Sequence, residues 1–484
     1  MTSCSCCLAA LLLLATALAD GAVFPRRRRG IRSSSCARDP GRGVRGPTSR
    51  LNSTQSCEQI DGSGSLGLCT GKRFKLDDDL LPRACPGPQP CLAWNVSLPH
   101  PVSGSVALSP TGKAVFVLGS NSSLYALRAL DGARLWEVPL PCGKQYGCPA
   151  TNVGPVATED AVFAAAEGGV LAVSQATGAV LWRVPFPTEG ADNHVTGQPL
   201  LAPQGNGSQL LIVPTQAQGV LALDAASGAQ RWAYAPPMSA CLAPTLSPDL
   251  RHVYTACNGQ TADVLELGLA DGSPRTVFSK EPAGIADGGV AVSSSGDTLF
   301  FGWLWAGNGH LVAVGAQDGA QHWGMPTKSY PLARPLFAPA LAPPFFLIAT
   351  DFGGKVYRLD PDNGTAAWTV QPAKGCGSDW NQCASIEANP AFAHGGRTVL
   401  LSMMDGPNHG KVHALSTADG SERWAVEAGG SLRASTSSPV VAPGVSADRF
   451  FVAAGALPFH GGGNVVLGGA VHAFDLPPLP PLAP

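Results

Sequence analysis

One pattern recurs seven times between residues 123 and 428 of this 484-residue chain: an apolar segment, a small-residue turn centred on glycine, and a position four residues later that is usually tryptophan. The first copy joins the apolar segment 124–127 to Gly132 and Trp136. The seven glycines lie 46, 50, 44, 47, 45 and 56 residues apart, at Gly132, Gly178, Gly228, Gly272, Gly319, Gly364 and Gly420. This period is typical of a four-stranded propeller blade and is too long for ankyrin or leucine-rich repeats. The pattern therefore predicts an all-β chain built as a radial array of small sheets.

Two further strands precede the pattern in each repeat. One is a short apolar segment, such as residues 115–118 or 162–165. The other has the form small-Pro-apolar-apolar, as in residues 154–157 and 438–441. Together with the segments on either side of the glycine turn, they give four strands per repeat, separated by Gly, Asp, Asn and Ser turns.

The two ends of the repeat array complete each other. The last repeat, residues 438–475, has three strands and no tryptophan strand. A tryptophan strand without a repeat of its own lies around Trp94, one period before Trp136. Pairing the two ends would remove both exposed sheet edges of the array. The sequence therefore predicts an eight-bladed β-propeller of four-stranded antiparallel blades over residues 85–476, with the last blade closed by the N-terminal strand.

The repeat resembles the tryptophan-docking repeat of pyrroloquinoline-quinone-type propellers. Residues 222–232 show the motif, six of the seven repeats keep the tryptophan, and the fourth has Thr276 in its place. The resemblance covers about residues 91–476. It implies that each tryptophan packs between neighbouring blades and that its N–H finds a backbone acceptor. The family includes calcium-dependent quinoprotein alcohol dehydrogenases as well as cofactor-free binding scaffolds, such as the bacterial outer-membrane assembly lipoprotein, so the fold does not choose between them.

The resemblance to the dehydrogenases lacks one of their features. Those enzymes carry an adjacent Cys-Cys disulfide against the cofactor, whereas the adjacent cysteine pair of this chain is Cys6-Cys7, near its start. We therefore expect a binding scaffold for a protein, peptide or glycan partner, with no cofactor and no enzymatic activity. The alternative is a pyrroloquinoline-quinone- and calcium-dependent alcohol or sugar oxidoreductase. Its candidate oxygen ligands for calcium are Asp351, Asp379, Asp405 and Asn408.

The ligand site is expected at one end of the propeller. In an antiparallel blade the loops between the second and third strands emerge at the same end as the loops between blades. Long loops are predicted at residues 302–310, 404–410 and 458–464. The polar residues expected at this mouth are Asp192, His194, Asp379, Asp405, Asn408, His409 and His460. The aromatic candidates, for a cofactor or a partner, are the tryptophans outside the repeat position: Trp303, Trp305 and Trp380.

These residues also have simpler interpretations. Tryptophans outside the core often anchor a loop, and a histidine in a loop is often solvated. His413 and His472 occupy a strand position that holds Leu, Val or Tyr in the other repeats, so we expect them to pack in the sheets.

The N-terminal region has the features of a secretory protein. An apolar core at residues 8–18 and the small-x-small site at 17–19 predict a signal peptide over residues 1–19. Residues 20–84 form a segment expected to be largely irregular, with Arg26 to Arg29 as either a processing site or part of a solvated linker. A Pro-rich tail follows at residues 477–484.

The cysteines and sequons fit export to an oxidising compartment. The predicted disulfides are Cys57–Cys69, Cys85–Cys91, Cys142–Cys148, Cys241–Cys257 and Cys376–Cys383, which leaves Cys36 over. The predicted glycosylation sites are Asn52, Asn95, Asn121, Asn206 and Asn363. We therefore expect a secreted or secretory-lumen protein without a transmembrane segment. With a formal net charge of -2 and 14% charged residues, the sequence shows no basic face of the kind that nucleic-acid binding requires, and its one basic run is confined to the N-terminal end.

Overall fold

The computed structural model separates the chain into two units, Met1–Lys75 and Leu76–Pro484, and every residue that it describes lies in the second unit. The described residues are Cys85, 87–100, Val102, 104–119, 123–140, 153–166, 168–186, 194–216, 218–236, 240–259, 261–281, 283–285, 288–305, 308–338, 345–373, Ile386, 388–404, 409–430, 437–442, 449–455 and 469–479.

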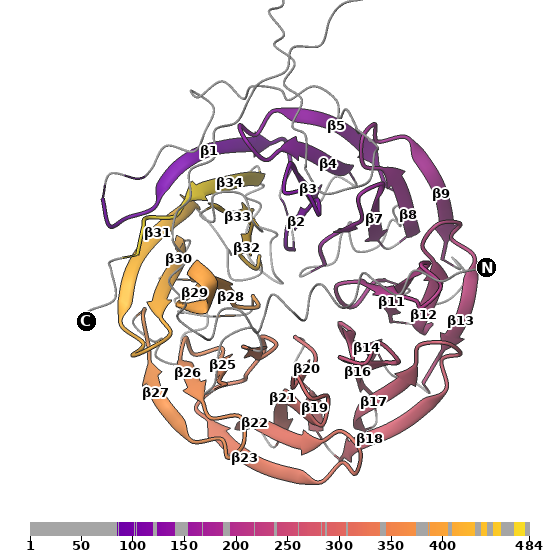
Figure 1. The fold of residues 1–484 in the computed structure, drawn as a ribbon, viewed down its shortest axis with the longest axis vertical. Helices are drawn as coiled ribbons and strands as arrows, with labels where there is room; N and C mark the ends of the chain where they lie inside the picture. Colours follow the sequence, from indigo (N-terminus) through magenta and orange to yellow (C-terminus); the bar gives the residue numbers. More distant parts are fainter. Residues whose placement is uncertain are drawn as a thin grey trace, which may run out of the picture. The chain divides into compact units, whose positions relative to one another are not determined.

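Eight antiparallel sheets stand side by side around a common axis, which confirms the predicted propeller (Figure 1). Blade 1 comprises β2 (Ala107–Leu108), β3 (Ala114–Gly119), β4 (Ser123–Arg128) and β5 (Arg134–Pro139). Blade 2 comprises β6 (Val156–Ala157), β7 (Ala161–Ala166), β8 (Gly169–Ser174) and β9 (Val180–Pro185). Blade 3 comprises β10 (Leu200–Pro203), β11 (Gln209–Thr215), β12 (Gly219–Asp224) and β13 (Gln230–Tyr234).

Blades 4 and 5 each have their inner strand in two pieces. Blade 4 comprises β14 (Ala240–Cys241), β15 (Thr245–Leu246), β16 (His252–Asn258), β17 (Ala262–Gly268) and β18 (Pro274–Lys280). Blade 5 comprises β19 (Ala283–Ile285), β20 (Ala291–Val292), β21 (Thr298–Trp305), β22 (Asn308–Gly315) and β23 (Gln321–Thr327).

The last three blades complete the ring. Blade 6 comprises β24 (Leu336–Phe337), β25 (Leu347–Thr350), β26 (Val356–Leu359) and β27 (Ala366–Val370). Blade 7 comprises β28 (Ala391–Ala393), the short 3₁₀ helix η3 (His394–Gly396), β29 (Thr398–Met404), β30 (His409–Ser416) and β31 (Glu422–Gly430). Blade 8 comprises β32 (Val440–Val441), β33 (Arg449–Ala454), β34 (Gly469–Asp475) and β1 (Cys91–Leu98).

Blade 8 is closed by the N-terminal strand, as the sequence predicted. Strand β1 pairs antiparallel with β34, with Asn95 opposite His472 and Val96 opposite Val471. Figure 1 shows β1 on the outer rim, covering β34 and preceding β5 of blade 1. The first and last strands of the propeller therefore form a single sheet, which leaves no open blade between them.

Core packing joins neighbouring blades rather than filling each blade separately. The two middle strands of a blade are buried along nearly their whole length, as in β3 and β7. The buried apolar residues form eight clusters, and each cluster takes its members from two adjacent blades. In the part of the chain that the structure describes, no helix has the length and apolar composition needed to cross a lipid bilayer.

The repeated tryptophan docks onto the next blade. At six junctions its indole Nε1 donates to a backbone carbonyl beside the next glycine turn, over 2.8 to 3.1 Å. The donor and acceptor pairs are Trp94 and Ala129, Trp136 and Gln175, Trp182 and Ala225, Trp232 and Leu269, Trp323 and Pro361, and Trp368 and Thr417. The glycine is required for this contact: Gly132 has a φ of +75°, and a Cβ there would lie 2.8 Å from Cε3 of Trp94.

The junction between blades 7 and 8 departs from this arrangement. Trp424 is buried and stacks on Phe450 at a centroid distance of 5.8 Å. Its Nε1 has no hydrogen-bond partner among the described residues. The structural difference is that β34 is followed by Leu476 and Pro477 and not by a glycine turn. Its ring packing is therefore retained without the indole hydrogen bond.

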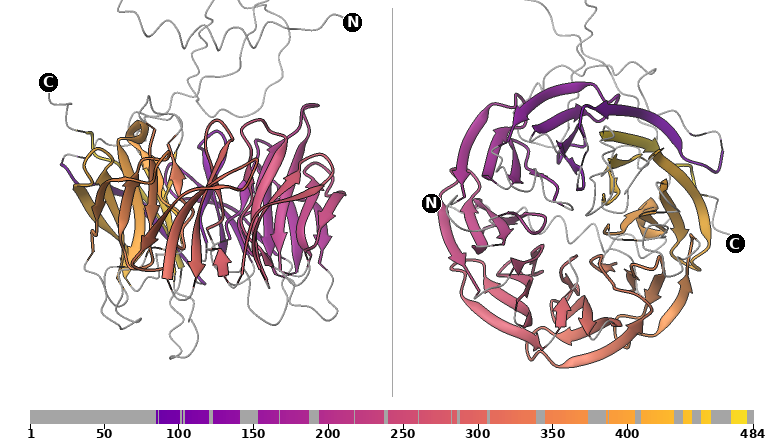
Figure 2. Two further views of the ribbon diagram at one scale, coloured as in Figure 1. Left: turned by 90° about the horizontal axis from the view of Figure 1, so that it is seen from below. Right: turned by 180° about the vertical axis from the view of Figure 1, so that it is seen from behind.

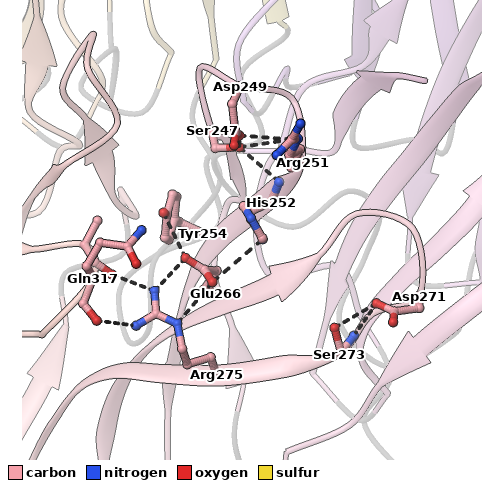
Figure 3. A network of polar contacts seen from close by, with 11 residues as sticks. Ser247, Asp249, Arg251, His252, Tyr254, Glu266, Asp271, Ser273, Arg275 and Gln317 are labelled. Carbon is pink, nitrogen blue, oxygen red and sulfur yellow. Dashed lines mark hydrogen bonds and ion pairs between the residues drawn. The ribbon is translucent and has the colours of Figure 1, made fainter. Parts of the chain in front are cut away.

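The junction between blades 4 and 5 uses an arginine in place of the missing tryptophan (Figure 3). Arg275, one residue before Thr276, donates from Nη2 to the carbonyl of Ala316 over 2.6 Å and from Nη1 to that of Gln317 over 2.9 Å. The guanidinium group also forms a bidentate pair with Glu266, at 3.1 and 2.7 Å. A cation on β18 therefore reaches the same part of the next blade that an indole reaches elsewhere.

Glu266 is the centre of this junction. Its Oε2 also accepts a hydrogen bond from the hydroxyl of Tyr254 over 3.0 Å, and His252 Nδ1 lies 3.7 Å from Oε1. Burial opposes ionisation of Glu266, but the hydrogen bonds from Arg275 and Tyr254 outweigh it and lower the pKa of the carboxyl group. The carboxylate is thus held ionised opposite the arginine.

Candidate functional site

One end of the ring gathers the linkers between blades and the turns between second and third strands. Figure 2 shows the ring edge on, with the strands running between its two ends. We call the end with the blade linkers the mouth. Most of the predicted mouth residues lie outside the described part of the chain: Asp192, Asp379, Trp380, Asp405, Asn408 and His460. Their roles stay predictions.

Trp303 and Trp305 lie in a strand and not in a loop, so the long loop predicted over residues 302–310 was wrong. Strand β21 continues to Trp305, which pairs with Asn308 at the start of β22. The reason is that aromatic and apolar residues, which favour β-strands, continue the strand past the glycines of this segment.

Trp303 is half-buried at the mouth, where it contacts blade 4. Its ring lies 6.2 Å from that of Phe278 and 5.6 Å from that of His310, measured between centroids. Lys280 Nζ lies 5.7 Å from its centroid, within the range of a cation–π contact. We call Phe278, Lys280, Trp303 and His310 the Trp303 cluster. It combines a large aromatic surface with a cation and an imidazole at the junction of blades 4 and 5.

Two of the three histidines predicted at the mouth, His194 and His409, lie among the described residues. His194 is half-buried, and its carbonyl accepts a hydrogen bond from Gln216 N after the end of β11. His409 is the first residue of β30 and pairs with Gly430 in β31. By contrast, His413 and His472 are buried in the sheets, 3% and 5% exposed, as predicted.

Asp351 does not present a free carboxylate to a metal ion. Its Oδ2 accepts a hydrogen bond from the Tyr357 hydroxyl over 2.8 Å, and its Oδ1 accepts one from Lys355 N over 3.0 Å. The residue is fully buried, and burial raises the pKa of its carboxyl group. Among the described residues, no three His, Cys, Asp or Glu side chains converge as metal ligands. The other three candidate calcium ligands, Asp379, Asp405 and Asn408, lie outside the described residues, so their roles stay predictions.

A second set of residues, five of them polar, lies at the inner edge of the ring, and the sequence interpretation missed it. In every blade, the residue two positions before the innermost strand lies at an equivalent place. The innermost strands are β2, β6, β10, β15, β20, β24, β28 and β32, where β15 and β20 are the second pieces of the divided strands of blades 4 and 5. We call these eight residues the inner ring: Ser105, Gly154, Gln198, Ala243, Gly289, Arg334, Asn389 and Ser438. The signal in the sequence is the position before the proline of the small-Pro-apolar segment, which six of these eight residues occupy; Ser105 and Gly289 precede valine instead.

Hydrogen bonds connect the inner ring from blade to blade. Ser438 N donates to Ser105 Oγ over 3.1 Å, and Asn389 N donates to Ser438 Oγ over 3.0 Å. Arg334 N donates to Asn389 Oδ1 over 2.8 Å. On the opposite side, Gln198 Nε2 donates to the carbonyl of Pro155 over 3.1 Å. Blades 6, 7, 8 and 1 are thus tied in one continuous chain.

Arg334 is the charged member of the inner ring. Its Nη1 donates to Thr245 Oγ1 of blade 4 over 3.0 Å, so its side chain crosses the inner edge of blade 5. Thr245 Oγ1 in turn donates to the carbonyl of Val290 over 2.6 Å. Burial lowers the pKa of the Arg334 guanidinium group below its usual range. Among the described residues, no carboxylate forms an ion pair with it.

Two of the predicted disulfides are formed in the structure: Cys85–Cys91, before and at the start of β1, and Cys241–Cys257, between β14 and β16. Disulfides of this kind belong to proteins that fold in an oxidising environment. The pairs Cys57–Cys69, Cys142–Cys148 and Cys376–Cys383 lie outside the described residues. Three sequon asparagines, Asn95, Asn206 and Asn363, are exposed, whereas Asn52 and Asn121 lie outside the described residues.

Comparison with solved structures shows the same architecture at low sequence identity. The Dos1 propeller matches with a TM-score of 0.57 at 9% identity, over 80% of this chain and 95% of that one. A europium-containing methanol dehydrogenase matches with a TM-score of 0.54 at 14% identity, over 80% of this chain and 93% of that one. At such identities the matches show the fold and not the activity.

Comparison with protein sequences gives a family and a local relative. A quinoprotein ethanol dehydrogenase of Pseudomonas aeruginosa is 32% identical over 102 residues, which are 20% of this chain and 16% of the relative. The matched segment is thus a small part of that enzyme. The signature of the family described as outer membrane protein assembly factor BamB matches residues 91–242 and 275–457, together more than half of the chain. The chain therefore belongs to the BamB-type family of pyrroloquinoline-quinone-like propellers.

Proposed function

We propose that this chain is a secreted binding scaffold that holds a protein, peptide or glycan partner at the mouth of the propeller. The observation that carries the proposal is the Trp303 cluster. It places a half-buried tryptophan beside Lys280 and His310 at the mouth. Tryptophan dominates the binding energy of many protein interfaces, because a large rigid ring loses much contact with water at little cost in conformational entropy.

The rest of the propeller supports this proposal by providing a rigid base. Docked tryptophans join the blades at the rim, and the inner-ring hydrogen bonds join four blades near the axis. Sites built on such elements hold their side chains in place before a partner arrives, which lowers the entropic cost of binding. The family's description as an assembly factor is consistent with a protein partner.

The test begins with photo-crosslinking from the mouth. A photoreactive amino acid replaces Lys280 in the cells that produce the protein, and the same residue replaces Arg183 on β9 as a rim control. A partner captured from position 280 and not from 183 is then purified and titrated. We expect Trp303→Ala to weaken its binding by roughly tenfold or more. Leu181→Ala, on the outer rim, is expected to leave the affinity unchanged. Equal loss in both variants, or no specific capture, would count against the proposal.

Export forms part of the proposal and has its own test. Asn95, Asn206 and Asn363 are exposed, so each can accept a glycan during passage through a secretory pathway. We expect the mature protein from a eukaryotic secretory host to lose mass on treatment with a glycosidase that removes N-linked glycans. We also expect its N-terminus to begin near residue 20. A protein of unchanged mass that retains residues 1–19 would contradict export by this route.

A second candidate function is a pyrroloquinoline-quinone- and calcium-dependent oxidoreductase. The observation in its favour is the local match to quinoprotein ethanol dehydrogenase. In such a site the quinone would accept electrons from an alcohol or sugar. Of its candidate calcium ligands, Asp351 has both carboxylate oxygens in hydrogen bonds, and Asp379, Asp405 and Asn408 lie outside the described residues. Tryptophan quenching by the quinone with calcium, together with dye reduction by alcohols, would favour this candidate over the scaffold.

A further inference from the structure

Several hydrogen-bond donors of the inner ring have no acceptor among the described residues. Ser105 Oγ, Ser438 Oγ and Asn389 Oδ1 each accept a backbone N–H from the neighbouring blade. A hydroxyl that accepts in this way can still donate its proton, and an amide that accepts at Oδ1 keeps two N–H donors. None of these remaining donors has an acceptor among the described residues. The inner edge of blades 7, 8 and 1 therefore presents donors without matching acceptors.

Arg334 adds a positive charge to this arc. Only one of the five N–H groups of its guanidinium group has a partner among the described residues, the hydroxyl oxygen of Thr245. No guanidinium nitrogen of Arg334 and no amide nitrogen of Asn389 is both sealed from solvent and unpartnered. The donors that lack a protein partner therefore keep some contact with solvent.

Blade 5 has no side chains at two positions of the inner edge that the Arg334 side chain crosses. Its inner-ring position and the residue before it are Gly289 and Gly288, which have no side chains. A Cβ at Gly288 would lie 2.0 Å from Arg334 N, and one at Gly289 would lie 2.6 Å from the carbonyl oxygen of Ala243. A side chain at Gly288 would therefore clash with the backbone of Arg334, and one at Gly289 would clash with the backbone of Ala243 in blade 4.

We propose that the inner ring binds a small oxyanion, in the form of a carboxylate or phosphate group, on the Arg334 guanidinium with Asn389 as a second donor. A guanidinium group offers two parallel N–H bonds that match the oxygens of either group. A partly desolvated cation with no carboxylate partner gains more from such a ligand than a solvated one. The site does not depend on the proposed partner, because it is formed by the propeller itself.

The experiment titrates the purified full-length mature protein with sodium phosphate and, separately, with sodium acetate at constant ionic strength in sodium chloride. Isothermal calorimetry gives the affinity, and the thermal midpoint gives the stabilisation by bound ligand. We expect saturable binding of at least one anion with a dissociation constant on the order of millimolar. Phosphate binding without acetate binding would identify phosphate compounds as the natural source, and the reverse would identify carboxylates.

Three variants distinguish binding at the inner ring from non-specific attraction of anions to positive charge. Arg334→Gln is expected to weaken binding by roughly tenfold or more, since a charged hydrogen-bonding group is lost. Asn389→Asp keeps an oxygen for Arg334 N but replaces the amide donors with an acceptor, so it is expected to weaken binding similarly. Arg183→Gln removes an exposed charge from β9 and is expected to change nothing.

Two results would overturn the proposal. One is the absence of saturable binding of both phosphate and acetate. The other is binding by Arg334→Gln or Asn389→Asp that equals that of the parent protein. If Arg334→Gln fails to fold, Arg334→Lys replaces it: the charge is kept but the planar fork is lost, and binding is still expected to weaken.

Discussion

The guanidinium group of Arg275 donates a 2.6 Å hydrogen bond to the main-chain carbonyl of Ala316. At six other junctions a tryptophan indole donates to a carbonyl in the matching part of the next blade. An arginine therefore provides the blade contact where the repeat has Thr276. Unlike an indole, the arginine carries a charge, and Glu266 is its counterion.

Removing Arg275 is expected to destabilise the propeller more than removing a surface arginine. Arg275→Ala breaks the contacts to blade 5 and leaves Glu266, whose side chain is 11% exposed, without its cation. We expect a loss of about 2 kcal/mol in the free energy of unfolding, measured by urea denaturation. The double variant Arg275→Ala with Glu266→Gln should recover part of this loss, because the uncompensated charge is gone. A loss no greater than that of Arg183→Ala would contradict the assigned role.

Trp94 and Arg449 are expected to act together at the closing junction. Trp94 Nε1 and Arg449 Nη1 both donate to the carbonyl oxygen of Ala129, each over 3.0 Å. Arg449 is also paired with Asp475 at 2.7 Å. We expect Trp94→Ala to cost about 3 kcal/mol or more, since a buried ring is lost at the strand that closes the ring. A double-mutant cycle with Arg449→Met should show a coupling of about 0.5 kcal/mol or more. If the losses in unfolding free energy of the two single variants simply add in the double variant, the two donors to Ala129 do not act together.

Glycine is expected to be required where it faces a docked indole. Gly132→Ala would force an alanine into a φ of +75° and place its Cβ 2.8 Å from Trp94 Cε3. We expect a loss of about 2 kcal/mol or more in unfolding free energy, from backbone strain and displacement of the ring. Gly205→Ala is the matched control, because a Cβ there meets nothing within 4 Å. Its effect should stay within about 0.5 kcal/mol. Similar losses in both variants would contradict the docking explanation.

Acidification is expected to weaken the closing blade through His472. This side chain is 5% exposed, its ring stacks on that of Phe474 at 6.1 Å, and burial lowers its pKa in the folded protein. The unfolded chain then binds a proton more readily than the folded one. Stability is therefore complete above the ordinary histidine pKa near 6.5 and falls as the pH drops from there toward the folded pKa.

The measurement is the urea midpoint between pH 7.5 and pH 5 for the parent protein and His472→Phe. Each unit by which the pKa is lowered contributes about 1.4 kcal/mol once the pH is below both values. We expect the variant to lose less stability than the parent on acidification. His322→Phe serves as a control for an exposed histidine on β23. Equal pH dependence in the parent and His472→Phe would contradict the prediction.

Much of the fold could be predicted from the sequence, because the geometry of a blade depends on short spacings between residues along the chain. The distance from Gly132 to Trp136 fixes a turn and the strand after it, and its repetition fixes the number of blades. The incomplete last repeat and the additional strand at Trp94 predicted the closure that β1 and β34 make. The burial of His413 and His472 also followed from their positions in the repeat.

The site was less accessible, and particular residues show why. Trp303 was expected in a long loop, but β21 and β22 extend to within a few residues of each other. The residue type of Asp351 suggests a metal ligand, but its carboxylate oxygens accept hydrogen bonds from the Tyr357 hydroxyl and the Lys355 backbone N–H. Strand extension and side-chain hydrogen bonding depend on neighbours, and residue types alone do not specify them.

The sequence by itself determined the repeat, the number of blades and the way the ring closes, because each depends on short-range patterning of turns and apolar residues. The tertiary structure decided that Arg275 replaces a tryptophan and that Arg334, Asn389, Ser438 and Ser105 form a hydrogen-bonded arc. Ser105 and Ser438 are 333 positions apart in the chain, and they meet only because the ring brings the starts of all blades to one axis.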